Sequence, residues 1–247
     1  MKRKNAGQNI QKRFNFSSPQ PRPFLAGLPA KIDTYEEGVA RFFRWKTGLD
    51  YYLTIDQIVD WVVNTQRSKV IDLLTDTATF ALRLAGLKAF PGRIFSFDNN
   101  VTLLERAKQR AVHLNLQPCI EFRYLQEPKF PIPDGFGEVA VSIFDLHRHP
   151  AEQYLTEAFR ILAPEGHLIL TEWLEPKSAK YSFSGIWKKM HLQYIQRNPV
   201  EAHAVYHDRE EIIQLLFEIG FRQITIWVLS VPASGNSGAF SLIDATK

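Results

Sequence analysis

From Lys69 onward, the chain alternates short apolar runs with stretches in which apolar residues recur at helical spacing. Each apolar run has the length of a buried strand, and each stretch between two runs carries a single apolar stripe. Strands that alternate with helices in this way form a parallel sheet covered by helices on both faces, because parallel strands need long crossover connections. The five runs are KVIDLL (69–74), GRIFSFD (92–98), CIEFRYL (119–125), EVAVSIFDL (138–146) and GHLILTEWL (166–174).

The end of the chain changes this rhythm and predicts an antiparallel pair of strands. Asp208 and Glu211 form a capping pattern before one more helical stripe, which Gly220 ends. Two strand-like runs follow, FRQITIWVLS (221–230) and GAFSLIDA (238–245), joined by a hairpin-like loop. The sequence therefore predicts an α/β fold: a Rossmann-like, doubly wound sheet of seven strands, mostly parallel, with an antiparallel C-terminal hairpin strand.

The segment before the first strand, residues 33–63, predicts two helical pieces. In the second piece, Thr54 followed by Gln57 has the pattern of a capping box and predicts that the helix begins there. The apolar stripe of this helix consists of Ile55, Ile58, Val59, Val62 and Val63.

Charge divides the chain into an arm and a body. Residues 1–32 contain seven Lys or Arg and no Asp or Glu, whereas the whole chain has a formal charge of only +4. We therefore expect a basic, flexible N-terminal arm at 1–32 and one domain at 33–247, in which the irregular segment 175–207 is a cap insertion. An arm of this kind suits contact with nucleic acid, with an anionic surface or with a partner subunit, so nucleic acid and a homodimer stay open as partners.

The composition limits the cellular compartment in which the protein can work and the kinds of metal or disulfide site that it can contain. A single cysteine, Cys119, excludes an internal disulfide and a CxxC metal site. The longest apolar runs are strand-sized, so we expect no membrane span, and the N-terminus lacks the apolar core of a secretory signal. These features predict a cytoplasmic protein. The spacing of His191, His203 and His207, without cysteine, is not that of a metal site.

The places to search for a ligand follow from the predicted sheet. In open α/β sheets, ligands bind outside the carboxyl ends of the strands, at the point where the strand order reverses. The segments directly after the five strands are 74–79, 98–100, 125–128, 144–149 and 172–176.

Several motifs in and around these segments form one pattern. They are DLLTDTA (72–78) in the place of D-x-G-x-G-T-G, FGEV (136–139) for F-D-x-V, LHR (146–148) for L-H-H, LTEAFRILAPEG (155–166) for L-x-E-x-x-R-V-L-K-P-G-G, and the late helix REEIIQLLFEIGF (209–221). With this order of elements, the chain resembles class I S-adenosylmethionine-dependent methyltransferases over about residues 35–247. The resemblance is strongest to the ubiquinone/menaquinone-biosynthesis branch, also called methyltransferase type 11.

The resemblance implies an enzyme that binds S-adenosylmethionine (SAM) and methylates a small molecule. The acid that binds the ribose hydroxyls in the family corresponds to Asp98, and Gln126 stands near the position of an adenine ligand. His147 lies at the L-H-H position and is the candidate catalytic base, whereas His149 precedes a proline that opens a helix. The implied cofactor-binding residues are Asp72, Leu74, Thr75, Asp76, Thr77, Asp98, Asn99, Gln126 and Phe144, and no metal ligand is implied.

The acceptor is expected to be apolar or aromatic. This expectation rests on aromatic residues in the predicted cap insertion, which would form the roof of a substrate pocket. They are Tyr181, Phe183, Trp187 and Tyr194.

The sequence departs from the family pattern at all three glycines of the first loop, which are Leu74, Asp76 and Ala78 here. Leu74 is expected to cost about 1 kcal/mol if its position requires positive φ. Asp76 is expected near the usual position of the cofactor's methionine carboxylate. Two unit charges about 4 Å apart repel by about 4 kcal/mol at an effective dielectric constant of about 20. These departures motivate an alternative, a catalytically inactive pseudo-methyltransferase that serves as a binding or scaffold protein.

Overall fold

The structure is a computed structural model, and it describes residues 34–126, 128–177, 204–231 and 238–247. In chain order its elements are α2 (Thr34–Thr47), α3 (Tyr51–Asn64), β1 (Lys69–Asp72), α4 (Thr79–Ala85), β2 (Arg93–Asp98), α5 (Val101–His113), β3 (Ile120–Tyr124), β4 (Gly137–Ile143), the 3-10 helix η2 (Leu146–Arg148), α6 (Ala151–Ile161), β5 (Leu162–Leu174), α10 (Arg209–Ile219), β6 (Arg222–Ser230) and β7 (Ala239–Thr246).

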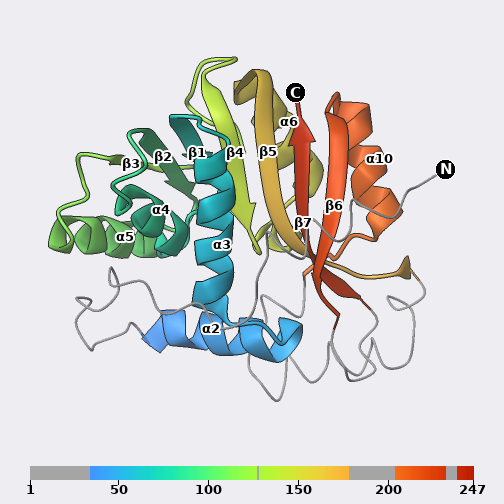
Figure 1. The fold of residues 1–247 in the computed structure, drawn as a ribbon, viewed down its shortest axis with the longest axis horizontal. Helices are drawn as coiled ribbons and strands as arrows, with labels where there is room; N and C mark the ends of the chain where they lie inside the picture. Colours follow the sequence, from blue (N-terminus) through green and yellow to red (C-terminus); the bar gives the residue numbers. More distant parts are fainter. Residues whose placement is uncertain (1–33, 127, 178–203, 232–237) are drawn as a thin grey trace.

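The strands form one seven-stranded sheet in the order β3-β2-β1-β4-β5-β7-β6 (Figure 1). Strands β1 to β5 pair in parallel, whereas β7 runs antiparallel to both of its neighbours, β5 and β6. The predicted fold class is therefore confirmed. The strand order reverses between β1 and β4, which places the ligand-binding crevice of such a sheet at the carboxyl ends of these two strands.

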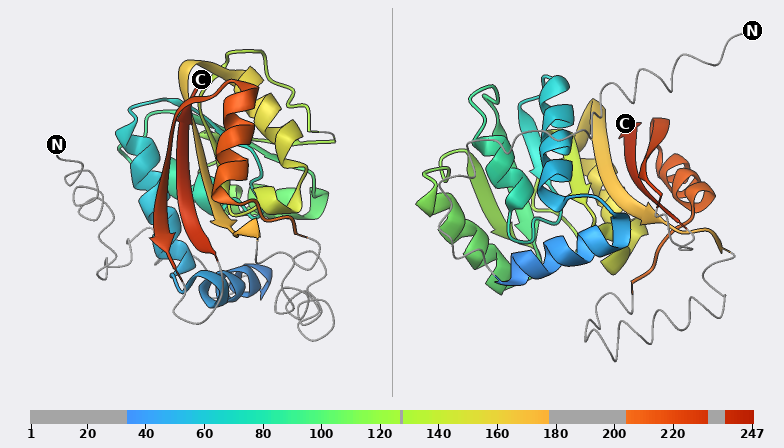
Figure 2. Two further views of the ribbon diagram at one scale, coloured as in Figure 1. Left: turned by 90° about the vertical axis from the view of Figure 1, so that its right-hand side faces the viewer. Right: turned by 60° about the horizontal axis from the view of Figure 1, so that its bottom comes forward.

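Helices cover both faces of the sheet, and each face has its own apolar core (Figure 2). Side chains of α3, α4 and α5 pack with Val70 and Val139 on one face. Side chains of α6 and α10 pack with Ile71 and Ala140 on the other face. Neighbouring strand residues thus point to opposite cores, because side chains alternate along a strand.

Helix α2 takes no part in covering either face. It lies across the carboxyl-terminal edge of the parallel strands, at the foot of α3 (Figures 1 and 2). Its Phe43 is 1% exposed and packs edge-on against Phe144 and Phe240, with ring centroids 5.3 and 5.0 Å apart. This aromatic cluster, which also contains Trp173, attaches α2 directly above the crevice.

The predicted start of α3 is wrong by one turn. Asp50 is the N-cap, and its carboxylate accepts a hydrogen bond from the Leu53 backbone N–H at 3.1 Å. The Thr54 hydroxyl instead donates to the Asp50 carbonyl at 2.7 Å, as threonine does inside a helix. In contrast, the capping box of Asp208 and Glu211 is present at the start of α10.

Parts of the predicted organisation lie outside the described residues. They include the whole basic arm, residues 1–32, and most of the predicted cap insertion, with Tyr181, Phe183, Trp187, Tyr194, His191 and His203. Within the described ranges, no helix has the length and apolar character required to cross a bilayer.

Candidate functional site

The loop from β1 to α4 has an unusual backbone for residues that are not glycine. Asp76 and Ala78 have φ values of 50° and 63°, in the left-handed region. L-residues adopt this region at a cost of about 1–2 kcal/mol, although aspartate and asparagine tolerate it better than most. Leu74 is not among the residues with positive φ, so the condition for its expected strain is not met. Leu74 is instead 4% exposed and packs in the core shared with α6.

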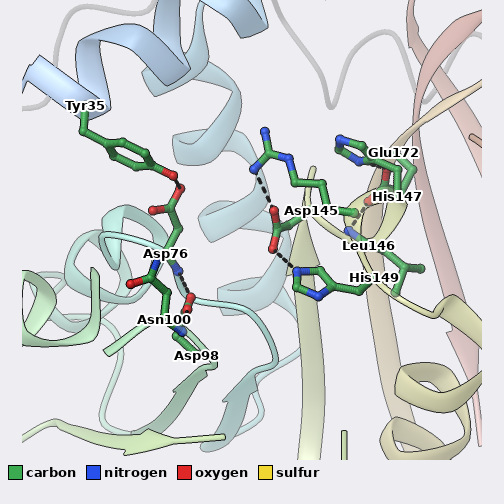
Figure 3. A network of polar contacts seen from close by, with 10 residues as sticks. Tyr35, Asp76, Asp98, Asn100, Asp145, Leu146, His147, His149 and Glu172 are labelled. Carbon is green, nitrogen blue, oxygen red and sulfur yellow. Dashed lines mark hydrogen bonds and ion pairs between the residues drawn. The ribbon is translucent and has the colours of Figure 1, made fainter. Parts of the chain in front are cut away.

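Asp98, the last residue of β2, holds this loop in place. Its carboxylate accepts hydrogen bonds from the backbone N–H of Asp76 and of Asn100, both at 2.7 Å (Figure 3). Burial raises the pKa of Asp98 to about 6, against the opposing effect of these two hydrogen bonds. Because each carboxylate oxygen has two lone pairs, both oxygens keep acceptor capacity for a ligand.

Asp72 forms the floor of the loop. It is 2% exposed and accepts a 2.6 Å hydrogen bond from the Thr75 hydroxyl. The Thr75 backbone N–H donates to the Phe97 carbonyl at 2.8 Å, which ties the loop to β2. Burial raises the pKa of Asp72 to about 7, although the hydrogen bond from Thr75 opposes the shift.

The Asp76 side chain is held between the loop and α2. Its Oδ2 accepts a 3.4 Å hydrogen bond from the Tyr35 hydroxyl of α2 (Figure 3). Its Oδ1 is buried and accepts no hydrogen bond from the residues that the structure describes. Burial and the nearby Asp145 carboxylate raise the pKa of Asp76 to about 7, with Arg148 acting in the opposite direction. An acceptor atom in this state is available for a donor group of a ligand.

This pKa predicts a pH-dependent stability. The ordinary pKa of an aspartate is 3.8. Folded Asp76 therefore binds more protons than unfolded Asp76 between pH 4 and 7, and its contribution to the free energy of unfolding falls as pH rises through this window. Asparagine resembles the protonated acid and tolerates positive φ. We expect Asp76→Asn to raise the melting temperature by several degrees at pH 8 and much less at pH 5.

Thermal unfolding of both proteins at pH 5 and pH 8 measures this difference. Glu218→Gln, on the exposed face of α10, is the matched control and is expected to change the two melting temperatures equally. A shift of equal size at both pH values for Asp76→Asn would exclude titration of Asp76 as the cause.

A buried ion pair fastens α2 to the same loop. Glu36 is 5% exposed, accepts a 2.7 Å hydrogen bond from the Thr79 hydroxyl, and lies 2.9 Å from the Arg110 guanidinium of α5. The Arg110 guanidinium also donates to the Thr77 carbonyl at 2.6 Å. Helix α2, the loop and α5 are thus joined by one charged network.

The end of β4 supplies the opposite wall of the crevice. Phe144 has a φ of 51° and is 4% exposed. Asp145 follows it and is paired with Arg148 at 2.8 Å and with His149 at 3.0 Å (Figure 3). Although burial alone would raise the pKa of Asp145, the hydrogen bond from His149 and the charge of Arg148 lower it below the ordinary value.

His147 lies on the other side of this segment. It is 3% exposed, and its Nδ1 lies 2.8 Å from the Glu172 carboxylate, which also accepts a hydrogen bond from the Leu146 N–H (Figure 3). Its ring is stacked on Tyr206, with centroids 4.9 Å apart. The His147 ring contacts the ring of Phe144, which lines the crevice, at a centroid distance of 4.8 Å.

These walls line a partly open cavity, which we call the loop cavity. Its volume is about 30 Å³, which is room for about one or two water molecules. Helix α2 covers it with Val39, and Phe80 and Ile143 supply apolar surface. The polar groups in its lining are Asp72, Thr75, Asp76, Thr79, Asp145, Arg148 and Tyr51.

The structure brings together most of the predicted site residues. Asp72, Leu74, Thr75, Asp76 and Phe144 line the loop cavity, Asp98 is bonded to the loop, and Thr77 is 3% exposed beneath it. Asn99 and Gln126 are exposed at the ends of β2 and β3. Within the described ranges, no three His, Cys, Asp or Glu side chains form a group suited to a metal ion.

Sequence reasoning missed several residues of the site. Tyr35, Glu36 and Arg110 come from helices whose patterns gave no sign of contact with the loop. Asp145 and Arg148 lie in the segment 144–149, which the sequence analysis singled out because it follows β4. The available signal was an acid followed closely by basic side chains in DLHRH.

Comparison with known proteins assigns the family. A comparison with family models matches residues 52–226 to the ubiE/COQ5 methyltransferase family. The ubiquinone/menaquinone biosynthesis C-methyltransferase UbiE of Rickettsia bellii (strain OSU 85-389) is 26% identical over 194 residues, which are 71% of this chain and 76% of that protein. The UbiE protein of Bartonella tribocorum is 27% identical over 152 residues, 58% of this chain and 56% of that protein.

Solved structures agree on the fold. A sarcosine dimethylglycine methyltransferase assigned in Galdieria sulphuraria superposes with a TM-score of 0.64 at 14% identity, covering 78% of this chain and 85% of that chain. The [4+2]-cyclase SpnF has a TM-score of 0.62 at 16% identity, covering 78% and 81%. At these identities the likeness concerns the fold alone, since one fold hosts different chemistries. The family match carries the assignment: the chain belongs to the ubiE/COQ5 methyltransferase family, and with it to the SAM-dependent methyltransferases that its sequence resembles.

Proposed function

We propose that this chain transfers a methyl group from SAM to a small acceptor with an apolar or aromatic ring. The observation that carries the proposal is the Asp98 carboxylate, fixed at the end of β2 by two backbone N–H groups beside a loop with left-handed turns. A carboxylate so placed can accept hydrogen bonds from both hydroxyls of a ribose.

The residues present fit the parts of SAM unequally. Asp98 suits the ribose, and the carboxylates of Asp72 and Asp76 suit the positively charged ammonium and sulfonium groups. The ionised Asp76 side chain does not suit the methionine carboxylate, because like charges repel across a buried site. The fit is therefore good for the nucleoside and for the cationic groups of the tail.

When bound, SAM would supply a methyl group on a sulfonium sulfur. The acceptor's nucleophilic atom attacks the methyl carbon in line, and the sulfur leaves as a thioether. The chain's own task is to orient the two reactants and exclude water. Helix α2 is placed to contribute to this, because Val39 lines the loop cavity and the Tyr35 hydroxyl donates a hydrogen bond to Asp76.

The names of the relatives and the rings around the crevice both support an aromatic acceptor. The UbiE relatives are named as C-methyltransferases of ubiquinone and menaquinone biosynthesis, and both products in that name are quinones. In this chain, rings surround the crevice: Phe42 and Phe43 pack on Phe144, and Tyr51 lines the loop cavity. His147 remains the predicted base, held by Glu172 behind the Phe144 ring.

Titration calorimetry with SAM, followed by transfer of a tritiated methyl group to 1,4-naphthohydroquinone, tests the proposal. We expect saturable binding and incorporation of label into the ring. His147→Gln is expected to reduce transfer while leaving SAM affinity within about threefold. Folded protein that releases no heat with SAM and transfers no label would instead favour the pseudo-methyltransferase alternative, which the comparisons do not support.

A further inference from the structure

We propose that the loop cavity selects a sulfonium nucleoside whose side chain carries an ammonium group and no carboxylate, with Asp76 as the selecting residue. The chemical class is that of decarboxylated SAM. The proposal deepens the proposed function and rests on the part of it that places the nucleoside at Asp98.

Asp76 lies next to the proposed ribose site. Its backbone N–H is bonded to Asp98, so the residue lies directly beside the carboxylate assigned to the ribose. Its side chain lines the loop cavity, in which we place the side chain of the nucleoside. The Oδ1 atom is buried, and no residue that the structure describes donates a hydrogen bond to it.

The lining of the loop cavity has more carboxylates than cationic groups. Three carboxylates line it, those of Asp72, Asp76 and Asp145, together with the guanidinium of Arg148. Arg148 and His149 are paired with Asp145. Within the described ranges, the ion pairs give neither Asp72 nor Asp76 a cationic side chain as partner. An ammonium group would add positive charge and hydrogen-bond donors beside those of Arg148, whereas a carboxylate would add a further negative charge.

Hydrogen bonds with two elements restrain Asp76. Its left-handed backbone is fixed by the 2.7 Å hydrogen bond to Asp98, and the Tyr35 hydroxyl holds Oδ2 from above. The bond to Asp98 fixes the backbone from which the side chain projects, and turning the side chain out of the cavity would break its contact with Tyr35. The loop therefore presents a carboxylate to a ligand in the cavity.

The inference is compatible with methyl transfer. Decarboxylated SAM and SAM carry the same adenosine and the same methyl group on sulfur, and they differ only in the carboxylate. The proposal therefore concerns which donor the site prefers and leaves the bond that breaks, between sulfur and the methyl carbon, unchanged.

Calorimetric titration at pH 8 tests the proposal with three ligands: SAM, decarboxylated SAM and methylthioadenosine, which has neither an ammonium nor a carboxylate. We expect the wild-type protein to bind decarboxylated SAM at least about tenfold more tightly than SAM. In Asp76→Asn the two affinities are expected to come within about threefold of each other. Methylthioadenosine is expected to bind both proteins within about twofold, because it does not reach the charged groups.

Asp134→Asn is the matched control, since Asp134 lies on the surface in an ion pair with Arg160. It is expected to keep the wild-type preference. Wild-type protein that binds SAM as tightly as decarboxylated SAM would overturn the inference and leave the proposed function intact. Failure of all three ligands to bind, methylthioadenosine included, would overturn the nucleoside site and the inference together.

Discussion

Replacing Asp98 by asparagine is expected to weaken binding of SAM and of methylthioadenosine by about 30- to 100-fold. The Asp98 carboxylate already accepts two backbone N–H groups and has the remaining lone pairs free for two ribose hydroxyls. Asparagine offers one oxygen, and its NH2 group would face a backbone N–H. Hydrogen bonds to a charged group contribute about 1.5–3 kcal/mol, which corresponds to the expected loss.

Calorimetry with both ligands measures the effect, and the melting temperature of the variant separates loss of binding from loss of fold. Asp134→Asn again serves as the control, because it removes an equal charge from an exposed residue that is paired with Arg160 and does not line the loop cavity. If Asp98→Asn bound methylthioadenosine within threefold of wild type, the carboxylate at the end of β2 would not be the ribose ligand.

Replacing Asp56 by alanine is expected to lower the free energy of unfolding by about 3–5 kcal/mol. Asp56 of α3 lies 2.5 Å from the guanidinium of Arg83, which is 3% exposed in α4 and also lies over the Tyr52 ring. Removing the carboxylate leaves a buried cation without its partner, and this is costlier than removing both charges. Because α4 follows the loop, the loss also loosens one wall of the loop cavity.

Urea denaturation of the variant measures this loss. The double variant Asp56→Leu with Arg83→Met is the informative companion, because it removes both charges and keeps most of the volume. We expect it to recover at least half of the lost stability. A loss below about 1 kcal/mol for Asp56→Ala would show that Arg83 finds compensation elsewhere.

The sheet, and the site residues at the ends of its strands, could be predicted because the sequence patterns that indicate them are local. Alternation of strand-like runs and helical stripes follows from side-chain periodicity, and it leads to the seven-stranded sheet that the structure confirms. Asp72, Asp98 and Phe144 then fall at one edge of the sheet without further information, because parallel strands bring their carboxyl ends together.

Other features could not be predicted because two signals competed or because the contact is distant. Asp50 and Thr54 are both good N-caps, and in the folded chain α3 begins after Asp50, where Tyr51 of the added turn packs against Phe43 of α2. Glu36 has the pattern of a solvated helix residue, yet it meets Arg110 across 74 positions of sequence. No local pattern specifies such a pair.

The sequence by itself determined the fold class, the family and the presence of an aspartate where the family has glycine. Those properties depend on residue type and spacing, which the chain carries along its length. The tertiary structure alone decided the surroundings of this aspartate: its left-handed backbone, its bond to Asp98, its contact with Tyr35, and a buried oxygen that accepts no hydrogen bond from the residues that the structure describes. These features arise only when α2, β2 and the end of β4 meet, because the charge and hydrogen bonding of a buried carboxylate are set by neighbours that folding brings to it.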